Sequence, residues 1–394
     1  MRIRFFNTFE PVSPFYRDLV PALVERGHEV EIFISQAEYR PGRVPLEQLL
    51  DHENVRIRRI PSGIKLANSA KKKLWVIFTY MVGTTFATLF GKRTDINFFL
   101  TQPPLFQILG RVLKSIRRQP FICLVMDLYP DVVVSNGWLK QDSFVARTLK
   151  WISRSNLRRA KNVVVIGRCM QDLLKEDQIE QTVLIPNWVN EDEVRRINAS
   201  ENTLRKELGL ESKFVCLYSG NIGVSHRFDD LLEVIRQLKD NDDIRFVFIG
   251  AGRRRKQIET FLEQHKLGNA IMLPYQPTER LAESLGLGQV HFVCLRNDFV
   301  GKVVRSKAYG AFAAGKPIIY QGDSKGEIAR VVKEFGVGFV LDEGDIEGLR
   351  DAVLKSSSDG KLLTQQSETA YRISREVYDR ESSLNKYAEL FEQN

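Results

Sequence analysis

The sequence has 394 residues, of which 43% are hydrophobic and 27% are charged. This length predicts about two or three domains with a core in each, and the composition excludes an intrinsically disordered protein. The net charge of +9 at pH 7 favours anionic partners such as nucleotide phosphates or an acidic lipid surface. No zinc-finger, RNA-recognition or helix-turn-helix signature is present, so the sequence predicts no binding to nucleic acid.

The four cysteines lie far apart, each inside an apolar run, at Cys123, Cys169, Cys216 and Cys294. No pair of them has the spacing of metal ligands. We therefore expect small core residues in a reducing compartment, and no bound metal. The N-terminal stretch lacks the long apolar region of a signal peptide, so export is not expected.

Strands and helices alternate in the first half of the chain. We expect a strand at 3–6, a helix at 15–26 and a strand at 30–34, with the spacing of a right-handed parallel crossover. The further elements expected in this half are strands at 96–100, 120–126 and 162–166 and a helix at 143–159.

An apolar segment, 74–91, is bracketed by lysines at 71–73 and by Lys92 and Arg93. Its length is at the lower limit for a membrane span. Three interpretations remain open: a core helix, a helix lying in a membrane interface, and a true span. The basic flanks favour an anionic lipid surface, where each lysine adds roughly 1 kcal/mol to binding. The protein is thus predicted to be cytoplasmic and peripheral at the inner face of the plasma membrane.

Asp127 directly follows the strand expected at 120–126. In a parallel sheet, ligands bind beyond the carboxyl ends of the strands, which places Asp127 at a candidate catalytic position. Its carboxylate could orient an acceptor hydroxyl or act as general base. The alternative is a structural role as a cap for the helix that follows Pro130.

Strands and helices alternate again in the second half of the chain. Before them we expect a hinge near 187–190 and a polar, helical stretch that reaches 212. Strands are expected at 214–218 and 245–249, with a helix at 228–238 between them. The chain therefore predicts an α/β protein with two doubly wound halves.

A glycine-containing loop follows the strand at 214–218 and includes Ser219, Gly220, Asn221 and Gly223. Its glycines let backbone N–H groups approach a phosphate with no Cβ in the way, and Arg227 is the local cation. The alternative is an ordinary turn, because a glycine often follows a strand.

A basic loop, a short helix rich in small residues and a buried strand are expected within 301–320. Ser306 is expected to cap a helix at 307–314, which Gly315 ends. Lys302, Arg305 and Lys307 would surround the helix N-terminus and form a site for a diphosphate. The alternative is an ordinary crossover helix with solvated lysines.

The run R-S-K-A-Y-G at 305–310, with A-A-G-K-P-I-I at 313–319, resembles the donor half of the retaining glycosyltransferases of family 4. The S-G-N-I-G loop at 219–223 and the phrase at 22–30, A-L-V-E-R-G-H-E-V, are similar to other parts of that family. The resemblance implies the GT-B fold, two Rossmann-like doubly wound parallel-sheet domains facing across a cleft. It implies an acceptor domain at 1–188, a donor domain at 189–377 and a last helix, 378–394, that packs back on the first domain.

The resemblance also implies further donor contacts. Tyr275 lies in a turn like the one whose backbone pairs with the nucleotide base, and Glu327 would meet a ribose hydroxyl or cap its helix. The sequence departs from the family at Val224, where an arginine is common, and at Lys302 and Gly310, which stand at the positions of a glutamate pair. Lys302, Arg305 and Lys307 would compensate by stabilising the leaving diphosphate.

The activity implied is transfer of a sugar, with retention, from a UDP- or GDP-type donor to an acceptor hydroxyl, with no tightly bound cofactor. The acceptor implied is a sugar or a polyprenyl-linked intermediate of a surface-polysaccharide pathway. Two alternatives remain: a nucleotide-sugar 2-epimerase on the same fold, and a non-catalytic partner protein that kept the fold.

Overall fold

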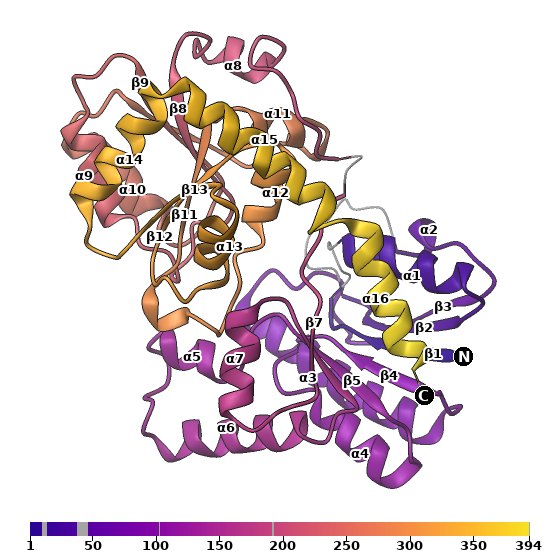
Figure 1. Cartoon of the computed structure of the whole chain (residues 1–394). Coiled ribbons are helices and arrows are strands. Elements are labelled where there is room, and N and C mark those ends of the chain that lie inside the picture. Colours follow the sequence, from indigo (N-terminus) through magenta and orange to yellow (C-terminus); the bar gives the residue numbers. More distant parts are fainter. Residues whose placement is uncertain (10–13, 38–45, 102, 191–192, 394) are drawn as a thin grey trace. The chain divides into compact units, whose positions relative to one another are not determined.

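The computed structural model describes residues 1–9, 14–37, 46–101, 103–190 and 193–393 (Figure 1). The chain divides into two compact units. Unit 1 comprises Met1–Pro186 and Glu381–Asn394, and unit 2 comprises Asn187–Arg380. Unit 2 thus begins at the position of the hinge expected at 187–190.

Unit 1 is built on a seven-stranded parallel sheet with the strand order β3-β2-β1-β4-β5-β6-β7. Its strands are β1 (Arg2–Phe6), β2 (Glu29–Ser35), β3 (Val55–Ile60), β4 (Ile96–Phe99), β5 (Phe121–Val125), β6 (Asn162–Val165) and β7 (Thr182–Leu184). The strands predicted in this half are confirmed. β3 was missed, because this edge strand reads VRIRRI and its arginines break up the apolar pattern.

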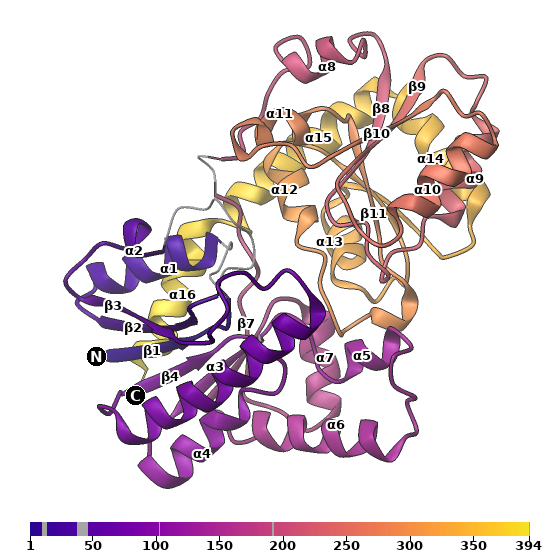
Figure 2. The same ribbon diagram turned by 180° about the vertical axis from the view of Figure 1, so that it is seen from behind.

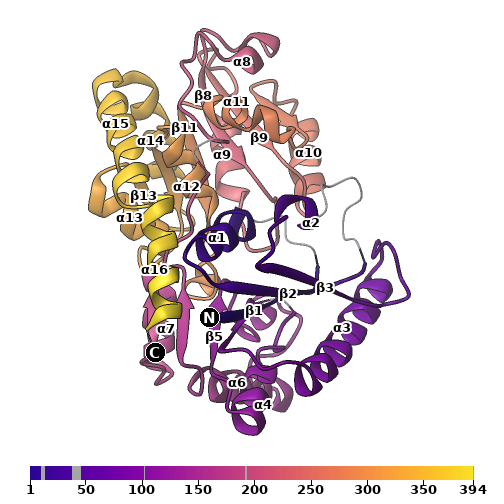
Figure 3. The same cartoon turned by 90° about the vertical axis from the view of Figure 1, so that its right-hand side faces the viewer.

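Helices cover both faces of this sheet. They are α1 (Pro14–Glu25), α2 (Leu46–Leu49), α3 (Ala70–Phe90), α4 (Ile108–Arg117), α5 (Asp131–Ser135), α6 (Phe144–Leu157), α7 (Arg168–Glu176) and α16 (Arg380–Glu392). Phe98 contacts Phe391 of α16, with ring centroids 5.4 Å apart, and the neighbouring Phe99 contacts Phe106 on the opposite face. The C-terminal helix therefore completes the core of unit 1 on one face (Figure 3).

Unit 2 has a six-stranded parallel sheet with the order β10-β9-β8-β11-β12-β13. The strands are β8 (Phe214–Ser219), β9 (Ile244–Ile249), β10 (Ala270–Leu273), β11 (Val290–Cys294), β12 (Ile318–Gln321) and β13 (Gly338–Leu341). The helices are α8 (Thr203–Glu207), α9 (Asp229–Gln237), α10 (Arg255–Gln264), α11 (Leu281–Gly286), α12 (Lys307–Ala313), α13 (Glu327–Phe335), α14 (Ile346–Ser358) and α15 (Gly360–Glu376), with 3₁₀ turns η1 (Thr278–Arg280) and η2 (Asn297–Phe299). The expectation of a helical stretch up to 212 is mostly wrong, since in its described part only the short α8 forms.

The central strands of unit 2, β8, β9, β11 and β12, are almost wholly buried on both faces, as parallel strands between helices should be, whereas the edge strands β10 and β13 are partly exposed. Cys216 and Tyr218 of β8 pack in a cluster with α9 and α14, whereas Val215 and Leu217 face a second cluster that includes Leu204 of α8. All four cysteines are buried and none forms a disulfide, which confirms them as core residues.

The buried His291 of β11 should make unit 2 less stable at acidic pH. Its Nε2 lies 2.9 Å from the Leu285 carbonyl oxygen, and burial lowers its pKa from 6.5 to about 4. Below pH 6.5 the histidine is protonated in the unfolded chain but remains neutral in the folded chain. The free energy of unfolding therefore falls by roughly 3 kcal/mol as the pH is lowered from 6.5 to about 4. A urea titration at several pH values should show this slope in the wild type and a smaller slope in His291→Gln, which keeps the contribution of the buried His226. The exposed His265→Gln should keep it, and an identical slope in His291→Gln would contradict the assignment.

Candidate functional site

The carboxyl ends of the parallel strands of unit 2 bring four loops to one edge of its sheet. β8 lies between β9 and β11, where the strand order reverses direction along the chain. Ligands of open α/β sheets bind in the crevice at such a switch point. The loops after β8, β9, β10 and β11 therefore form the candidate site of this unit.

The loop after β8 is held by its own backbone. The N–H groups of Gly220 and Ile222 donate to the carbonyls of Ile249 and Ala251 at 2.9 Å, and the N–H of Gly223 lies 3.2 Å from His226 Nδ1. The amides of Gly220, Ile222 and Gly223 therefore already have partners, and phosphate binding by the other amides of the loop stays a prediction. Ser219, predicted in the loop, is the last residue of β8, and Asn221 lies in the loop.

Close packing of this loop on the next one requires a glycine at 250. Gly250 has φ +143°, and a Cβ there would lie 2.0 Å from the carbonyl oxygen of Gly220. Arg255 donates to the carbonyls of Gly250 and Leu273 and so ties the ends of β9 and β10 together. Arg255, the first residue of α10, is therefore a structural residue of this edge and not a solvated cation.

Lys307, the first residue of α12, is buried against the loop after β8. Its Nζ lies 3.6 Å from the centroid of the Tyr218 ring, and a Cβ on Gly220 would lie 3.9 Å from it. Among the described residues this ammonium has no hydrogen-bond acceptor. Burial holds the pKa of Lys307 well below its ordinary value, and the nearby Arg305 lowers it further. The interpretation of Lys307 as a solvated lysine is therefore wrong.

His226, which was not among the predicted site residues, lies beside this lysine. Its ring stands edge-on to Tyr218, with centroids 5.7 Å apart, and stacks on Phe228 at 5.9 Å. Its Nε2 is buried, and within the described part of the chain it makes no hydrogen bond. Burial, and then the charges of Lys307 and Arg305, lower the pKa of His226, so the ring is neutral. Two buried nitrogens at one sheet edge thus lack acceptors, which is the arrangement that an oxyanion would satisfy.

Two arginines hold the loop over this site. Arg305 Nη2 lies 3.4 Å from the Ser225 carbonyl oxygen, and Arg296 Nη1 lies 3.5 Å from that of Val224. Arg296 also donates to Asp298 at 2.8 Å. Arg296 lies two residues after the end of β11, and a cation at the carboxyl end of a strand was the signal for this residue in the sequence.

The remaining predicted cations do not join Lys307. Lys302 Nζ donates to the Asp298 carbonyl oxygen at 2.8 Å in an exposed hydrogen bond. Arg227 lies within 3.6 Å of Asp230, 3.8 Å of Asp229 and 3.9 Å of Glu343, so acidic side chains already offset its charge. The expectation of Arg227 as the local donor cation is therefore not supported by its surroundings.

The start of α12 also differs from the expectation. Ser306 is in the αR region and makes no capping hydrogen bond with its side chain. α12 has seven residues, too few to give its N-terminus a strong dipole. The positive potential at the site must therefore come from side chains.

Two more predicted residues lie at the same sheet edge. Tyr275, which follows β10, is 48% exposed, and a Cβ on Gly250 would lie 3.5 Å from its ring. Glu327 is 6% exposed in the first turn of α13, where the helix dipole favours a carboxylate. Gly326, not Glu327, is the N-cap residue of that helix.

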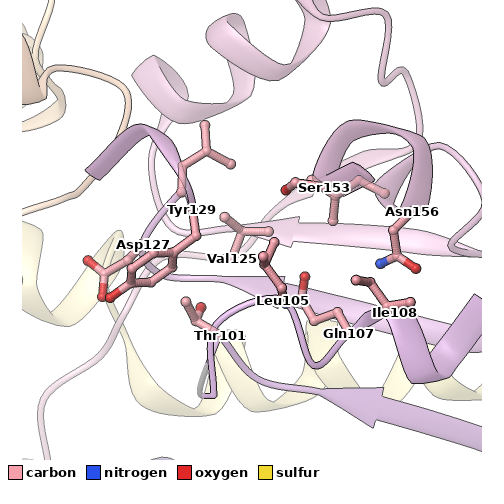
Figure 4. Close-up of a pocket in the computed structure, with 11 residues that line it drawn as sticks. Thr101, Leu105, Gln107, Ile108, Val125, Asp127, Tyr129, Ser153 and Asn156 are labelled. Carbon is pink, nitrogen blue, oxygen red and sulfur yellow. The ribbon is translucent and has the colours of Figure 1, made fainter. Parts of the chain in front are cut away.

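Unit 1 places Asp127 at the corresponding edge of its own sheet. The residue follows β5 and lines a small pocket with Thr101, Gln107, Tyr129 and Asn156. Figure 4 shows the Asp127 carboxylate beside the Tyr129 ring at one end of this pocket and Asn156 at the other. Burial and the charge of Asp127 raise the pKa of Tyr129 to about 12. The N-cap position of α5 is Pro130.

Both units match models of known protein families. Residues 12–188 match the family model described as glycosyl transferase 4-like domain, and residues 200–373 match that of the glycosyl transferases group 1. The probable glycosyltransferase WbjE of Pseudomonas aeruginosa is 29% identical over 251 residues, which are 63% of this chain and 62% of that protein. The putative colanic acid biosynthesis glycosyl transferase WcaI of Escherichia coli strain K12 is 22% identical over 390 residues, 95% of each chain.

Solved structures resemble the whole chain. Sucrose-phosphate synthase from Thermosynechococcus elongatus has a TM-score of 0.78 at 16% identity, with 100% of this chain and 98% of that chain covered. Anabaena Alr3699/HepE in complex with UDP-glucose has a TM-score of 0.74 at 14% identity, with 100% of both chains covered. At these identities the likeness shows the fold alone.

Proposed function

The chain belongs to the glycosyltransferases of the family 4 type, and on this premise we propose which of its residues carry out sugar transfer. The GT-B fold predicted from the sequence is confirmed, as two parallel-sheet α/β units. The chain is a glycosyltransferase that uses a nucleotide sugar. The finer statements below concern the donor, the acceptor and the stereochemistry.

Unit 2 binds the donor diphosphate beside the loop after β8. The observation that carries this proposal is the buried Lys307 ammonium, which has no acceptor in the described structure and lies against Tyr218. A diphosphate oxygen would accept from Lys307 Nζ and from His226 Nε2, with Arg305 adding positive charge. Tyr275 and Glu327 lie at the same edge, where a nucleoside would extend from the diphosphate.

The reaction follows from this charge arrangement. The bond between the anomeric carbon and the diphosphate oxygen breaks, and negative charge develops on the leaving diphosphate. A fixed cation in a site of low dielectric stabilises this charge without having to reorganise. Side chains therefore supply the positive charge that a metal ion would supply elsewhere. The acceptor oxygen joins the anomeric carbon from the face that the diphosphate left, which retains its configuration.

Asp127 of unit 1 orients the acceptor hydroxyl or takes up its proton. The carboxylate lies at the carboxyl end of β5 in a pocket lined by further polar groups, Thr101, Gln107 and Asn156. The acceptor is a sugar on a polyprenyl-linked intermediate at the cytoplasmic face of the membrane. The name of the relative WcaI, which refers to colanic acid biosynthesis, supports a surface glycan as the product.

A thermal-shift screen with UDP and GDP tests the donor. A nucleotide present at about a hundred times its dissociation constant stabilises the protein by roughly 2.7 kcal/mol, so one of the two should raise the melting temperature clearly. The matching nucleotide sugars, incubated with a polyprenyl-linked sugar, should give a product whose anomeric signal in NMR matches that of the donor. Inverted product would overturn retention, and the absence of any shift with both nucleotides would overturn the donor site.

A further inference from the structure

Helix α3 carries its apolar side chains on the outside of unit 1. The exposed side chains are Leu74, Trp75, Phe78, Val82, Phe86 and Phe90, and Phe90 is 81% exposed. The side facing the sheet includes two fully buried threonines, Thr84 and Thr88. A surface helix of a globular protein has the opposite arrangement, with its apolar stripe toward the core. Something other than the core of unit 1 must therefore account for the exposed stripe.

The helix is nevertheless anchored to unit 1 at both ends. Trp75 Nε1 donates to the Ser62 carbonyl at 3.0 Å, and Tyr80 donates to that of Phe33 at 3.0 Å. At the far end, Arg117 donates to the carbonyls of Leu89 and Gly91. α3 is long and apolar enough to cross a membrane, yet only 22% of its most apolar window is buried. It therefore lies along the sheet, and its outer side is not a core surface.

Two neighbouring helices extend this surface. Figures 2 and 3 show α3, α4 and α6 side by side on one face of the seven-stranded sheet. α4 and α6 add the exposed apolar residues Ile116, Phe144 and Trp151. We call the exposed side of these three helices the α3–α4–α6 face.

Charge on this layer has one sign. The three helices contain no acidic residue and nine basic ones: Lys71, Lys72, Lys73, Arg111, Lys114, Arg117, Arg147, Lys150 and Arg154. Arg154 is buried and pairs with Asp131 and Asp177, so it does not add to the surface charge. Lys150 lies within 4 Å of the same two carboxylates, which offset its charge in part. Lys92 and Arg93, which follow α3, are exposed and place further cations at its C-terminal end. Basic residues thus flank the apolar stripe at both ends.

The helices on the opposite face of the sheet differ. α1 and α16 carry acidic residues, among them the exposed Glu25, Glu381, Glu389 and Glu392. These two helices also contain three basic residues, Arg17, Arg380 and Lys386, so their charge is mixed. An anionic surface would therefore favour the α3–α4–α6 face over the opposite face. This segregation gives the apolar stripe a definite orientation toward such a surface.

We propose that the α3–α4–α6 face docks on an anionic lipid bilayer, with α3 lying flat in the interface. Aromatic and aliphatic side chains enter the boundary between headgroups and acyl chains, while the lysines and arginines meet the lipid phosphates. The occupant is a bilayer because the apolar stripe and the flanking cations match the two layers of a lipid surface. The inference goes beyond sugar transfer, since it concerns unit 1 and requires no donor.

Vesicle co-sedimentation of the full chain tests this proposal. Vesicles that contain phosphatidylglycerol should bind the protein at least about tenfold more strongly than vesicles of phosphatidylcholine alone, and added salt should weaken the binding. The triple variant Phe78→Ser/Phe86→Ser/Phe90→Ser and the variant Lys71→Gln/Lys72→Gln should each lose most of it. Matched controls on other surfaces, Leu49→Ser and Lys361→Gln, should bind as the wild type does. An unchanged circular dichroism spectrum and an unchanged melting curve of the whole chain would show that each variant is folded.

Tryptophan quenching adds a site-specific result. Brominated lipid should quench the fluorescence of Trp75, so Trp75→Phe should remove much of the quenching, whereas Trp188→Phe, a buried residue of unit 2, should not. Equal binding to neutral and anionic vesicles, or full binding by the triple variant, would overturn the proposal. The wild type could instead form a dimer and bind no vesicles, while the triple variant stays monomeric. This result would assign the face to a second copy of the chain.

Discussion

Replacing Lys307 by methionine should remove donor binding and at the same time stabilise the free protein. The ammonium is buried beside Tyr218 without an acceptor in the described structure, so its desolvation is not compensated until an anion arrives. Methionine has a similar length and carries no charge. The hydrogen bond from a charged donor contributes about 1.5 to 3 kcal/mol, which corresponds to a loss of affinity of roughly tenfold to more than a hundredfold.

Isothermal titration with the nucleotide and a melting curve of the free variant check both parts of this prediction. Lys239→Met removes an exposed lysine of the same unit and serves as the matched control, with unchanged affinity. His226→Ala should weaken binding by a smaller factor, because it removes a neutral donor. If Lys307→Met bound the nucleotide as the wild type does, the diphosphate site would lie elsewhere.

Replacing Asp127 by asparagine should abolish most sugar transfer and leave donor binding intact. If the carboxylate takes up the acceptor proton, its removal costs a factor of about 10² to 10⁴ in rate. The donor site lies in unit 2 and contains no residue of unit 1 in this account, so the dissociation constant of the nucleotide should not change. Steady-state transfer rates and nucleotide titration measure the two effects separately.

The control for this experiment is Asp142→Asn, which changes an exposed carboxylate of the same unit. A pH profile distinguishes proton transfer from orientation, because only a general base gives an acidic limb that the asparagine variant lacks. Full activity of Asp127→Asn, with an intact melting curve, would remove the residue from the mechanism.

Much of the fold could be predicted because buried parallel strands give clear apolar runs. The strand at 318–321 and the helix before it came from such a pattern, and the family resemblance fixed their place in the donor half. β3 was missed because it has no apolar run: arginines alternate with its apolar residues, which is the pattern of a half-exposed strand. The stretch before α8 was misjudged because its polar composition suits a loop as well as a helix.

The site could be predicted less completely, because its chemistry depends on side chains that the sequence does not place. Lys307 was identified by its motif, but its burial on Tyr218 is a three-dimensional property. Arg227 was assigned a donor role because the sequence did not show that Glu343 would lie within 3.9 Å of it. His226 was missed for the same reason, since its unpaired Nε2 becomes visible only when Phe228 and Tyr218 enclose the ring.

The loop after β8 shows a second limit of prediction from the sequence. Its glycines indicated that backbone amides would meet a phosphate, yet these amides bond to the neighbouring loop and to His226. The same glycines are needed because the two loops pack closely, as the 2.0 Å approach to a Cβ at Gly250 shows. A glycine pattern alone does not distinguish these two roles.

A crystal structure of the full chain with its nucleoside diphosphate tests the central claim most directly. The account predicts a phosphate oxygen about 2.8 Å from Lys307 Nζ, within hydrogen-bond distance of His226 Nε2 and close to the loop after β8. Phosphates bound away from Lys307, with its ammonium still enclosed against Tyr218, would contradict it.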